Sequence, residues 1–194
     1  MLANLALKAD DISPDEYLSG ELTATEKHEY LNGFVYPCNM AGAGDAHVKI
    51  SLNAAALIKT HLRGSGCSTY ISDMRVKINA KDKAWFYPDV MVTCDTEDRE
   101  RDTIKHSPIL IIEVLSPSTR DYDRGDKFAV YRQLTSLREY VLIDPTAYLV
   151  EIFRLNAAKR WELFSYEGAE TTVEFTSIDW QCTLSELYED VRMA

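Results

Sequence analysis

The sequence predicts an α/β (α+β) fold in which a mixed central β-sheet is flanked by helices. Its 194 residues are 46% hydrophobic, which suffices for one soluble domain with a sizeable core. Helical and strand-like patterns follow one another as helix, strands, helix, strands, the order expected when helices pack on a sheet. Residues 109–115 are almost continuously apolar, as in a central strand that is buried on both faces. We therefore expect a single domain over residues 1–194.

The N-terminal third predicts a short helix, a hairpin and a long helix. Ser13 and Pro14 suit the N-cap and the first position of a helix. Asn32-Gly33 separates two short apolar stretches, and this dipeptide is a strong signal for a hairpin turn. Residues 45–62 carry apolar side chains at spacings of three and four, and Gly64 ends that helical pattern.

The rest of the chain predicts strands together with two further helices. Short apolar runs separated by polar turns are typical of strands. We expect strands at residues 68–71, 74–78, 90–94, 109–115, 138–144, 148–155 and 160–166, and helices at residues 120–134 and 183–191. The acidic segment 95–102 is expected to be a solvated loop.

The net charge of −10 would disfavour nucleic acid as a partner if it were spread evenly over the chain. It is not: residues 1–29 hold 7 acidic and 2 basic side chains, and residues 162–194 hold 8 and 1. Residues 30–161 therefore keep 16 acidic and 18 basic side chains, a net charge of +2. A site for a polyanion is expected in this middle part, although a merely uneven surface charge explains the same pattern.

Three observations bear on the compartment. No run of about 18–20 apolar residues without a charge is present, so no membrane span is expected. The first 16 residues lack the basic and apolar regions of a secretory signal. Cys38, Cys67, Cys94 and Cys182 lie far apart without a CxxC motif, which favours four small buried side chains over a disulfide framework or a zinc site. We expect a cytoplasmic protein.

Two acidic residues stand at unusual places in the predicted sheet. Glu113 lies in the middle of the apolar run 109–115, where a carboxylate costs several kcal/mol unless it is paired or holds a metal. Asp89 follows Pro88 at the entry to the strand 90–94. If the two strands are neighbours, both carboxylates reach one point, and two carboxylates with a backbone carbonyl suit Mg²⁺ or Mn²⁺. A buried ion pair at Glu113 is the structural alternative.

Several motifs together resemble a known family. They are Tyr87-Pro88-Asp89, residues 112–119 (IEVLSPST), residues 121–131 (DYDRGDKFAVY), residues 28–33 (HEYLNG) and His47. The pattern is similar to that of the cyanobacteria-rich "putative restriction endonuclease" family of the restriction-endonuclease-like PD-(D/E)xK superfamily. The resemblance covers residues 26–145, so that residues 146–194 are expected to form a β-rich C-terminal extension with extra strands.

The resemblance implies a restriction-endonuclease-like mixed sheet and metal-assisted hydrolysis of phosphodiester bonds in nucleic acid, with DNA as the favoured substrate. Asp89 and Glu113 would be the metal ligands, with the Val114 carbonyl as a third, and Mg²⁺ or Mn²⁺ would be the cofactor. Glu29 would be an accessory acid that holds a second metal or a metal-bound water. Double-strand cutters often work as dimers, and the β-rich C-terminal third offers a surface for a homodimer.

The chain departs from the superfamily pattern at one position. The motif has Lys two residues after the Glu, where this chain has Leu115. In the resembling family the lysine is supplied by the following helix, which makes Lys127 a candidate for stabilising negative charge, with Tyr131 one turn further on the same face. A solvated lysine that pairs with Asp123 is the structural alternative for Lys127.

Three further positions are interpreted less specifically. His47 is expected to orient the substrate or a water, or else to be a structural histidine at a helix N-terminus. Arg124 is a candidate for binding substrate phosphates together with Tyr131, although arginines on this acidic helix also fit surface ion pairs. The aromatic residues 85–87 beside Asp89 suit either stacking on a base or a place in the core of the sheet.

Two other functions fit the same residues. One is a nuclease fold without activity that binds or regulates a partner. The other is a metal-dependent hydrolase of small phosphorylated metabolites, which the acidic composition would not disfavour.

Overall fold

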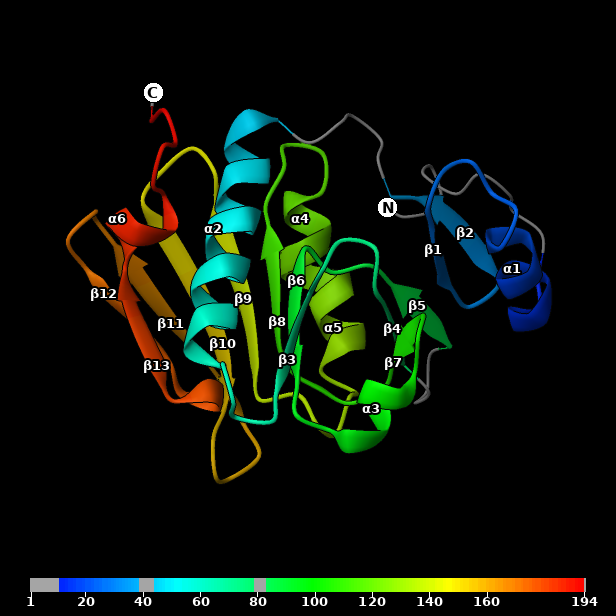
Figure 1. Ribbon diagram of the computed structural model, residues 1–194. Coiled ribbons are helices and arrows are strands. Elements are labelled where there is room, and N and C mark those ends of the chain that lie inside the picture. The colour runs from blue at the N-terminus through cyan, green and yellow to red at the C-terminus, as the bar shows by residue number, and fades with distance from the viewer. Residues whose placement is uncertain (1–10, 39–43, 79–82, 194) are drawn as a thin grey trace.

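The computed structural model describes residues 11–38, 44–78 and 83–193, in which two sheets and their helices form the fold (Figure 1). The larger sheet has six strands in the order β11-β10-β9-β8-β6-β3, and a second sheet has five in the order β2-β1-β5-β4-β7. Only the β8–β9 pair of the larger sheet is parallel, so this sheet is mixed as predicted. The strands of the larger sheet are β3 (Ser68–Ile71), β6 (Val90–Thr93), β8 (Pro108–Val114), β9 (Glu139–Asp144), β10 (Leu149–Leu155) and β11 (Trp161–Glu167).

The six-stranded sheet is covered on both faces. The long helix α2 (Asp45–His61) crosses one face, and a second helical segment lies on the other (Figure 1). That segment, expected at residues 120–134, consists of α4 (Arg120–Tyr122), the π-helical turn η2 (Asp123–Lys127) and α5 (Phe128–Tyr131). A π-helical turn inside an α-helix is rare and is often found at functional sites.

Alternation along β8 decides which side chains meet which helix. Leu110, Ile112 and Val114 belong to the apolar cluster that includes α2, whereas Ile111 belongs to the cluster that includes α5. Since successive side chains of a strand point to opposite faces, Glu113 lies on the face of Ile111. A buried carboxylate is thereby directed toward the helical segment 120–131.

The five-stranded sheet carries the N-terminal part of the chain. Its strands are β1 (His28–Leu31), β2 (Phe34–Pro37), β4 (Arg75–Ile78), β5 (Ala84–Phe86) and β7 (Ile104–Lys105). The helix α1 (Pro14–Glu21) packs on it through the aromatic side chains of Tyr17, Tyr30 and Trp85. The predicted hairpin is present, and Asn32 and Gly33 both adopt positive φ angles, which the tight turn requires.

The expected loop at residues 95–102 is wrong. The segment contains the helix α3 (Thr96–Glu100), capped by Asp95, and Asp98 is completely buried. The Asp98 carboxylate accepts hydrogen bonds from the Thr93 hydroxyl and from the amides of His106 and Ser107. Asp98 therefore stabilises this segment inside the protein and does not face solvent, because its carboxylate accepts several hydrogen bonds.

The C-terminal extension is β-rich as predicted, but the expected helix 183–191 shortens to α6 (Leu184–Leu187). It is preceded by a hairpin that the sequence analysis did not identify, made of β12 (Thr172–Phe175), the 3₁₀ turn η3 (Thr176–Ile178) and β13 (Trp180–Thr183). The buried carboxylate of Glu139 accepts hydrogen bonds from the backbone amides and hydroxyls of Thr176 and Ser177. This fixes the hairpin to β9.

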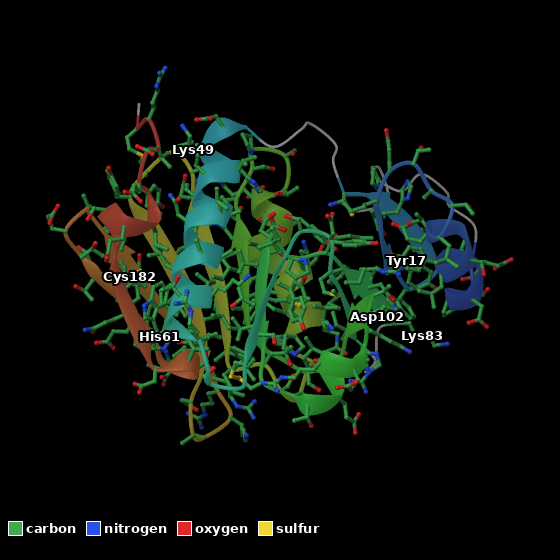
Figure 2. The ribbon with its side chains drawn as sticks, in the orientation of Figure 1. Tyr17, Lys49, His61, Lys83, Asp102 and Cys182 are labelled. Carbon is green, nitrogen blue, oxygen red and sulfur yellow. A yellow bond between two sulfur atoms is a disulfide. The ribbon has the colours of Figure 1, made fainter. Side chains whose placement is uncertain are left out.

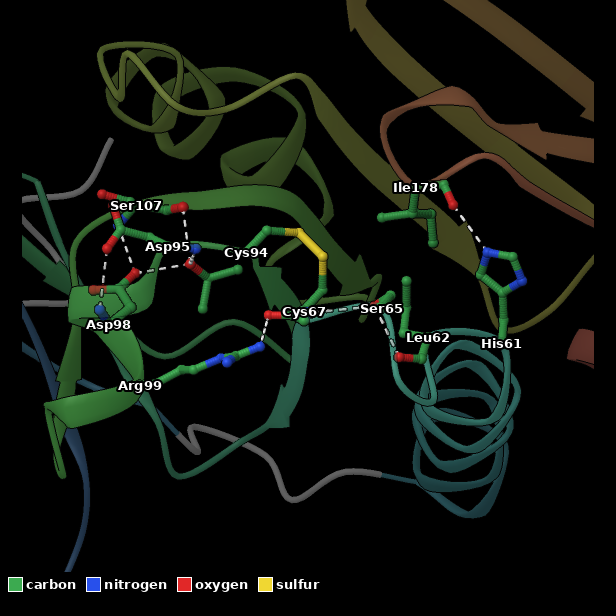
Figure 3. The surroundings of a disulfide bond; sticks show 12 residues. His61, Leu62, Ser65, Cys67, Cys94, Asp95, Asp98, Arg99, Ser107 and Ile178 are labelled. Atoms are coloured by element: carbon green, nitrogen blue, oxygen red, sulfur yellow. Dashed lines mark hydrogen bonds between the residues drawn. A yellow bond between two sulfur atoms is a disulfide. The ribbon is translucent and has the colours of Figure 1, made fainter.

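The expectation of four unpaired cysteines is wrong as well. Cys67 and Cys94 form a disulfide, while Cys38 and Cys182 are free (Figure 3). Cys67 precedes β3 and Cys94 follows β6, and these antiparallel strands pair Ser68 with Thr93. Cys67 and Cys94, the next residue along each strand, therefore face each other. The spacing of cysteines in the sequence does not reveal this pairing. Within the described ranges, no helix is long and apolar enough to cross a membrane.

The disulfide gives a first testable prediction. Replacing both Cys67 and Cys94 by Ser should lower the free energy of unfolding by about 2–4 kcal/mol in oxidising buffer, because the bridge restricts the unfolded chain. Urea unfolding of the two proteins measures the difference. A thiol assay of the denatured, unreduced wild type should find two reactive cysteines. Four would contradict the pairing.

Candidate active site

Three elements place buried charged side chains around one lysine. Lys127 lies on η2, and its Nζ atom is 2.9 Å from Oε1 of Glu113 on β8 and 3.1 Å from Oε1 of Glu29 on β1. A third carboxylate oxygen, Oδ1 of Asp123, is 3.9 Å away on the same π-helical turn. All four side chains are almost completely buried. Lys127 is thus a shared counter-ion and not a solvated lysine.

The helical segment 120–131 supplies several of the contacts. Asp123 and Lys127 lie at the two ends of η2, and the Tyr140 hydroxyl donates a hydrogen bond to the Asp123 backbone carbonyl at 2.9 Å. The Tyr131 hydroxyl, one turn beyond Lys127, donates to Oε1 of Glu113 at 3.1 Å. The Lys127 ammonium also lies 5.7 Å and 5.9 Å from the ring centroids of Phe86 and Tyr131.

Asp89 is held beside Glu113 by the backbone of β8. Its Oδ2 atom accepts a hydrogen bond from the Val114 amide at 2.7 Å and lies 3.2 Å from Nε2 of His47, in the first turn of α2. The Ser72 amide binds the Asp89 carbonyl at 3.1 Å. β6 and β8 are neighbours in the sheet, as the argument from the sequence required. The structure therefore brings Asp89, Glu113, Lys127, Glu29 and His47 together.

The excess of acids over bases sets the protonation of this cluster. Burial raises the pKa of Glu113 well above its ordinary value; Lys127 opposes this shift, and Asp89, Asp123 and Glu29 add to it. Burial would lower the pKa of Lys127, but Glu113, Glu29 and Asp123 outweigh it and raise that pKa. The lysine therefore keeps its charge, and the raised pKa of Glu113 favours its protonated form.

His47 and Asp123 respond to the same charges. Burial would lower the pKa of His47, but its hydrogen bond to Asp89 and the charge of that carboxylate raise it overall. Burial also raises the pKa of Asp123, although the Lys127 charge and a hydrogen bond from Thr119 oppose the shift. An imidazolium at His47 would partly compensate the acids.

The oxygen atoms of Asp89 and Glu113 fit a hard divalent cation. Asp89 contacts Val114 and His47 through Oδ2, and Glu113 contacts Tyr131 and Lys127 through Oε1. The two carboxylates and the Val114 carbonyl are oxygen donors of the kind that Mg²⁺ and Mn²⁺ prefer. Among the described residues, no group of three or more His, Cys, Asp or Glu side chains is arranged so that it could hold a metal ion.

Of the two residues expected to bind substrate, only Tyr131 belongs to the cluster. Its hydroxyl is engaged by Glu113, and its ring is completely buried. Arg124 instead forms an ion pair with Glu151 on β10. Its helix neighbour Arg120 pairs with Asp144 at 2.8 Å. The structure thus pairs both arginines with acids that lie outside the cluster around Lys127.

Two residues of the site were missed in the sequence. Asp123 was interpreted as a surface partner of Lys127, yet it is buried with it; its spacing of four residues before Lys127 is the signal that placed both on one face. Glu21 accepts hydrogen bonds from the Tyr87 hydroxyl at 3.1 Å and the His28 amide at 2.9 Å. It thereby connects the segments that carry Asp89 and Glu29, and nothing in its local sequence indicates this.

Comparison with known proteins gives a consistent result. The model of the Uma2 family, described as "Putative restriction endonuclease", matches residues 14–185. Two uncharacterized proteins of Synechocystis sp. (strain ATCC 27184 / PCC 6803 / Kazusa) are similar along most of their length. One, slr1290, is 35% identical over 177 residues and 91% of both chains; the other, sll1609, is 36% identical over 164 residues, or 83% of this chain and 90% of the relative.

A solved structure shares the fold. The crystal structure of a "putative nuclease belonging to DUF820" from Anabaena variabilis ATCC 29413 superposes with a TM-score of 0.73. The match covers 91% of this chain and 97% of the other, at 17% sequence identity. The likeness at this identity concerns the arrangement of helices and strands.

The shared lysine gives a prediction about stability. Lys127→Met should lower the free energy of unfolding by about 3–5 kcal/mol, because it leaves several buried acids without their cation. Adding Glu113→Gln should restore part of the loss, since it removes one of these acids. Chemical denaturation of both variants measures the effect. Wild-type stability of Lys127→Met would show that the lysine does not compensate the cluster.

The raised pKa of Glu113 gives a prediction about pH. The folded protein binds this proton more tightly than the unfolded chain, so its contribution to stability is complete below the ordinary value of 4.5 and is lost as the pH rises through the folded pKa. The metal-free wild type should therefore lose stability relative to Glu113→Gln as the pH rises above 4.5. Unfolding curves of both proteins at several pH values test this, and a constant difference between them would contradict it.

Proposed function

The chain belongs to the Uma2 family of putative restriction endonucleases, and from this premise we propose that it is a divalent-metal-dependent nuclease that hydrolyses phosphodiester bonds of nucleic acid, with DNA as the substrate. The observation that carries the proposal is the buried cluster in which Lys127 lies between Glu113 and Glu29. Asp89 lies beside it and accepts a hydrogen bond from the amide of Val114, the residue that follows Glu113 on β8. A merely structural ion pair would not need an excess of carboxylates, which destabilises the folded protein.

Each residue of the cluster has a role in this reaction. Asp89 and Glu113 would hold the cation, with the Val114 carbonyl as a further oxygen donor, and Glu29 would be the accessory acid. Bound Mg²⁺ or Mn²⁺ lowers the pKa of a coordinated water and withdraws negative charge from the phosphate. Lys127 would stabilise the negative charge that develops on the phosphate, in the place of the missing lysine at Leu115.

The remaining side chains orient these groups. Tyr131 holds Oε1 of Glu113 by a hydrogen bond and would thereby orient the carboxylate that holds the cation. His47 binds Asp89 and can hold a water or the substrate in the same region. Arg124 has to release Glu151 before it can bind a phosphate, because the two side chains are ion-paired.

The proposal also concerns partners and location. DNA is the expected partner and the cytoplasm the expected compartment, although the Cys67–Cys94 disulfide removes the cysteines as an argument for a reducing environment. Each chain contributes one such cluster, so cutting both strands of a duplex in one binding event would need a homodimer, for which the C-terminal strands offer a surface.

The decisive experiment is cleavage of defined DNA substrates. We expect the wild type to cut single-stranded or duplex DNA in the presence of Mg²⁺ or Mn²⁺, and Asp89→Asn and Glu113→Gln to abolish cleavage while the protein stays folded. Lys127→Ala should slow turnover by about 100- to 1,000-fold, because it removes the charge that stabilises the reacting phosphate.

A matched control is available on the neighbouring strand. Glu151→Gln also neutralises a carboxylate that is ion-paired to the helical segment 120–131, but outside the cluster, and should keep most of the activity. Unchanged Mn²⁺ binding by Asp89→Asn would favour a nuclease fold without catalysis. Turnover of a simple phosphodiester without cleavage of DNA would favour a hydrolase of small phosphorylated metabolites.

A further inference from the structure

We propose that Lys27 binds a phosphate group of the nucleic-acid strand at the edge of the carboxylate cluster, beside the ring of Tyr87. This inference rests on the proposed function and names a contact that the cluster itself lacks. A site with several carboxylates repels a polyanion, so a strand that reaches it needs cations nearby. We use the name phosphate rim for the side chains of Lys27, Tyr87 and Asp73.

Contacts place the phosphate rim next to the cluster. Lys27 directly precedes β1, which carries Glu29, and its Nζ atom lies 5.7 Å from the ring centroid of Tyr87. The Tyr87 amide donates to Oε1 of Glu29 at 3.1 Å. The amide of Cys38, directly after β2, donates to the Lys27 carbonyl at 3.0 Å, which holds Lys27 beside the β1–β2 hairpin.

Lys27 has a more exposed side chain than Lys127. Its side chain is 34% exposed and pairs with Oδ1 of Asp73 at 2.7 Å, and Asp73 is 88% exposed. An exposed pair of this kind stabilises the protein little, so a phosphate can take the place of the Asp73 carboxylate. The neighbouring Ser72 donates its amide to the Asp89 carbonyl at 3.1 Å, which keeps this turn at the edge of the site.

A second cation lies beside the same ring. The guanidinium carbon of Arg75 lies 5.8 Å from the ring centroid of Tyr87, and its buried Nη1 atom has no hydrogen-bond partner among the described residues. Arg120 and Arg124 are paired with carboxylates of the six-stranded sheet that are only 5% and 15% exposed. The exposed carboxylate that pairs with Lys27 is more easily displaced by a ligand.

The test measures binding of DNA without cleavage. A fluorescent single-stranded oligonucleotide and a duplex are titrated with Glu113→Gln protein in Mg²⁺ buffer at several salt concentrations. Adding Lys27→Gln should weaken binding of at least one of them about 5- to 10-fold and lower the salt slope by about one, as expected for one lost phosphate contact. Lys27→Arg should keep the affinity, and Asp73→Asn should raise it, since it removes the competing carboxylate.

Lys49→Gln is the matched control. Lys49 is likewise about one-third exposed and paired with an aspartate, Asp45, at 2.9 Å. It lies on α2, away from Tyr17 of α1 (Figure 2). We expect this variant to bind DNA as its parent does. An equal loss for Lys27→Gln and Lys49→Gln would show a general charge effect and overturn the proposal.

Other outcomes separate the two proposals. If the wild type cleaves DNA but Lys27→Gln binds it unchanged, the nuclease stands and the phosphate rim is wrong. If the wild type neither binds nor cleaves either DNA, both the rim and a DNA substrate are wrong. Binding of inorganic phosphate at millimolar concentration gives the last outcome. If Lys27→Gln abolishes binding of free phosphate but leaves the affinity for both oligonucleotides unchanged, Lys27 forms a site for free phosphate. That result would overturn the assignment to a strand.

Discussion

The charge imbalance around Lys127 is the constraint on which the rest of the structure depends. One ammonium lies among the carboxylates of Glu113, Glu29 and Asp123, all removed from water. Such an arrangement is stable only if the surrounding elements hold every member in place and supply further donors. The Tyr131 hydroxyl donates to Glu113 and the Tyr87 amide to Glu29, while the Val114 amide donates to the neighbouring Asp89.

The two faces of the six-stranded sheet contribute differently to the site. The face under α2 is apolar, with Leu110, Ile112 and Val114 of β8 packed among aliphatic side chains. This packing helps to offset the cost of burying Glu113 on the opposite face, the face of Ile111. The helical segment 120–131 covers that face (Figure 1). The second sheet is needed at the site because it brings Glu29, so both sheets contribute to one cluster.

Local patterns in the sequence predicted much of this arrangement. The apolar run around Glu113, the Asn-Gly turn and the long helix with His47 each follow from neighbours along the chain, and the family resemblance added Glu29 and Lys127. Contacts between distant segments were not predictable: the division of the strands into two sheets, the Cys67–Cys94 bridge and the burial of Asp123 depend on register and packing. Asp98 shows a related limit: its donors His106 and Ser107 are only eight and nine residues away, but the composition of an acidic run does not reveal that the chain folds back over it.

The same imbalance couples the cation, the proton and the substrate. The carboxylates that raise the pKa of Glu113 are the charges that would attract a divalent cation, so the proton and the cation compete for one group. Without the cation, the acids also repel a phosphate, and Lys127 is already compensated by its neighbours. If Asp89 and Glu113 hold a cation as proposed, its binding would favour deprotonation of Glu113 and entry of the strand together, and the order of assembly would follow from charge.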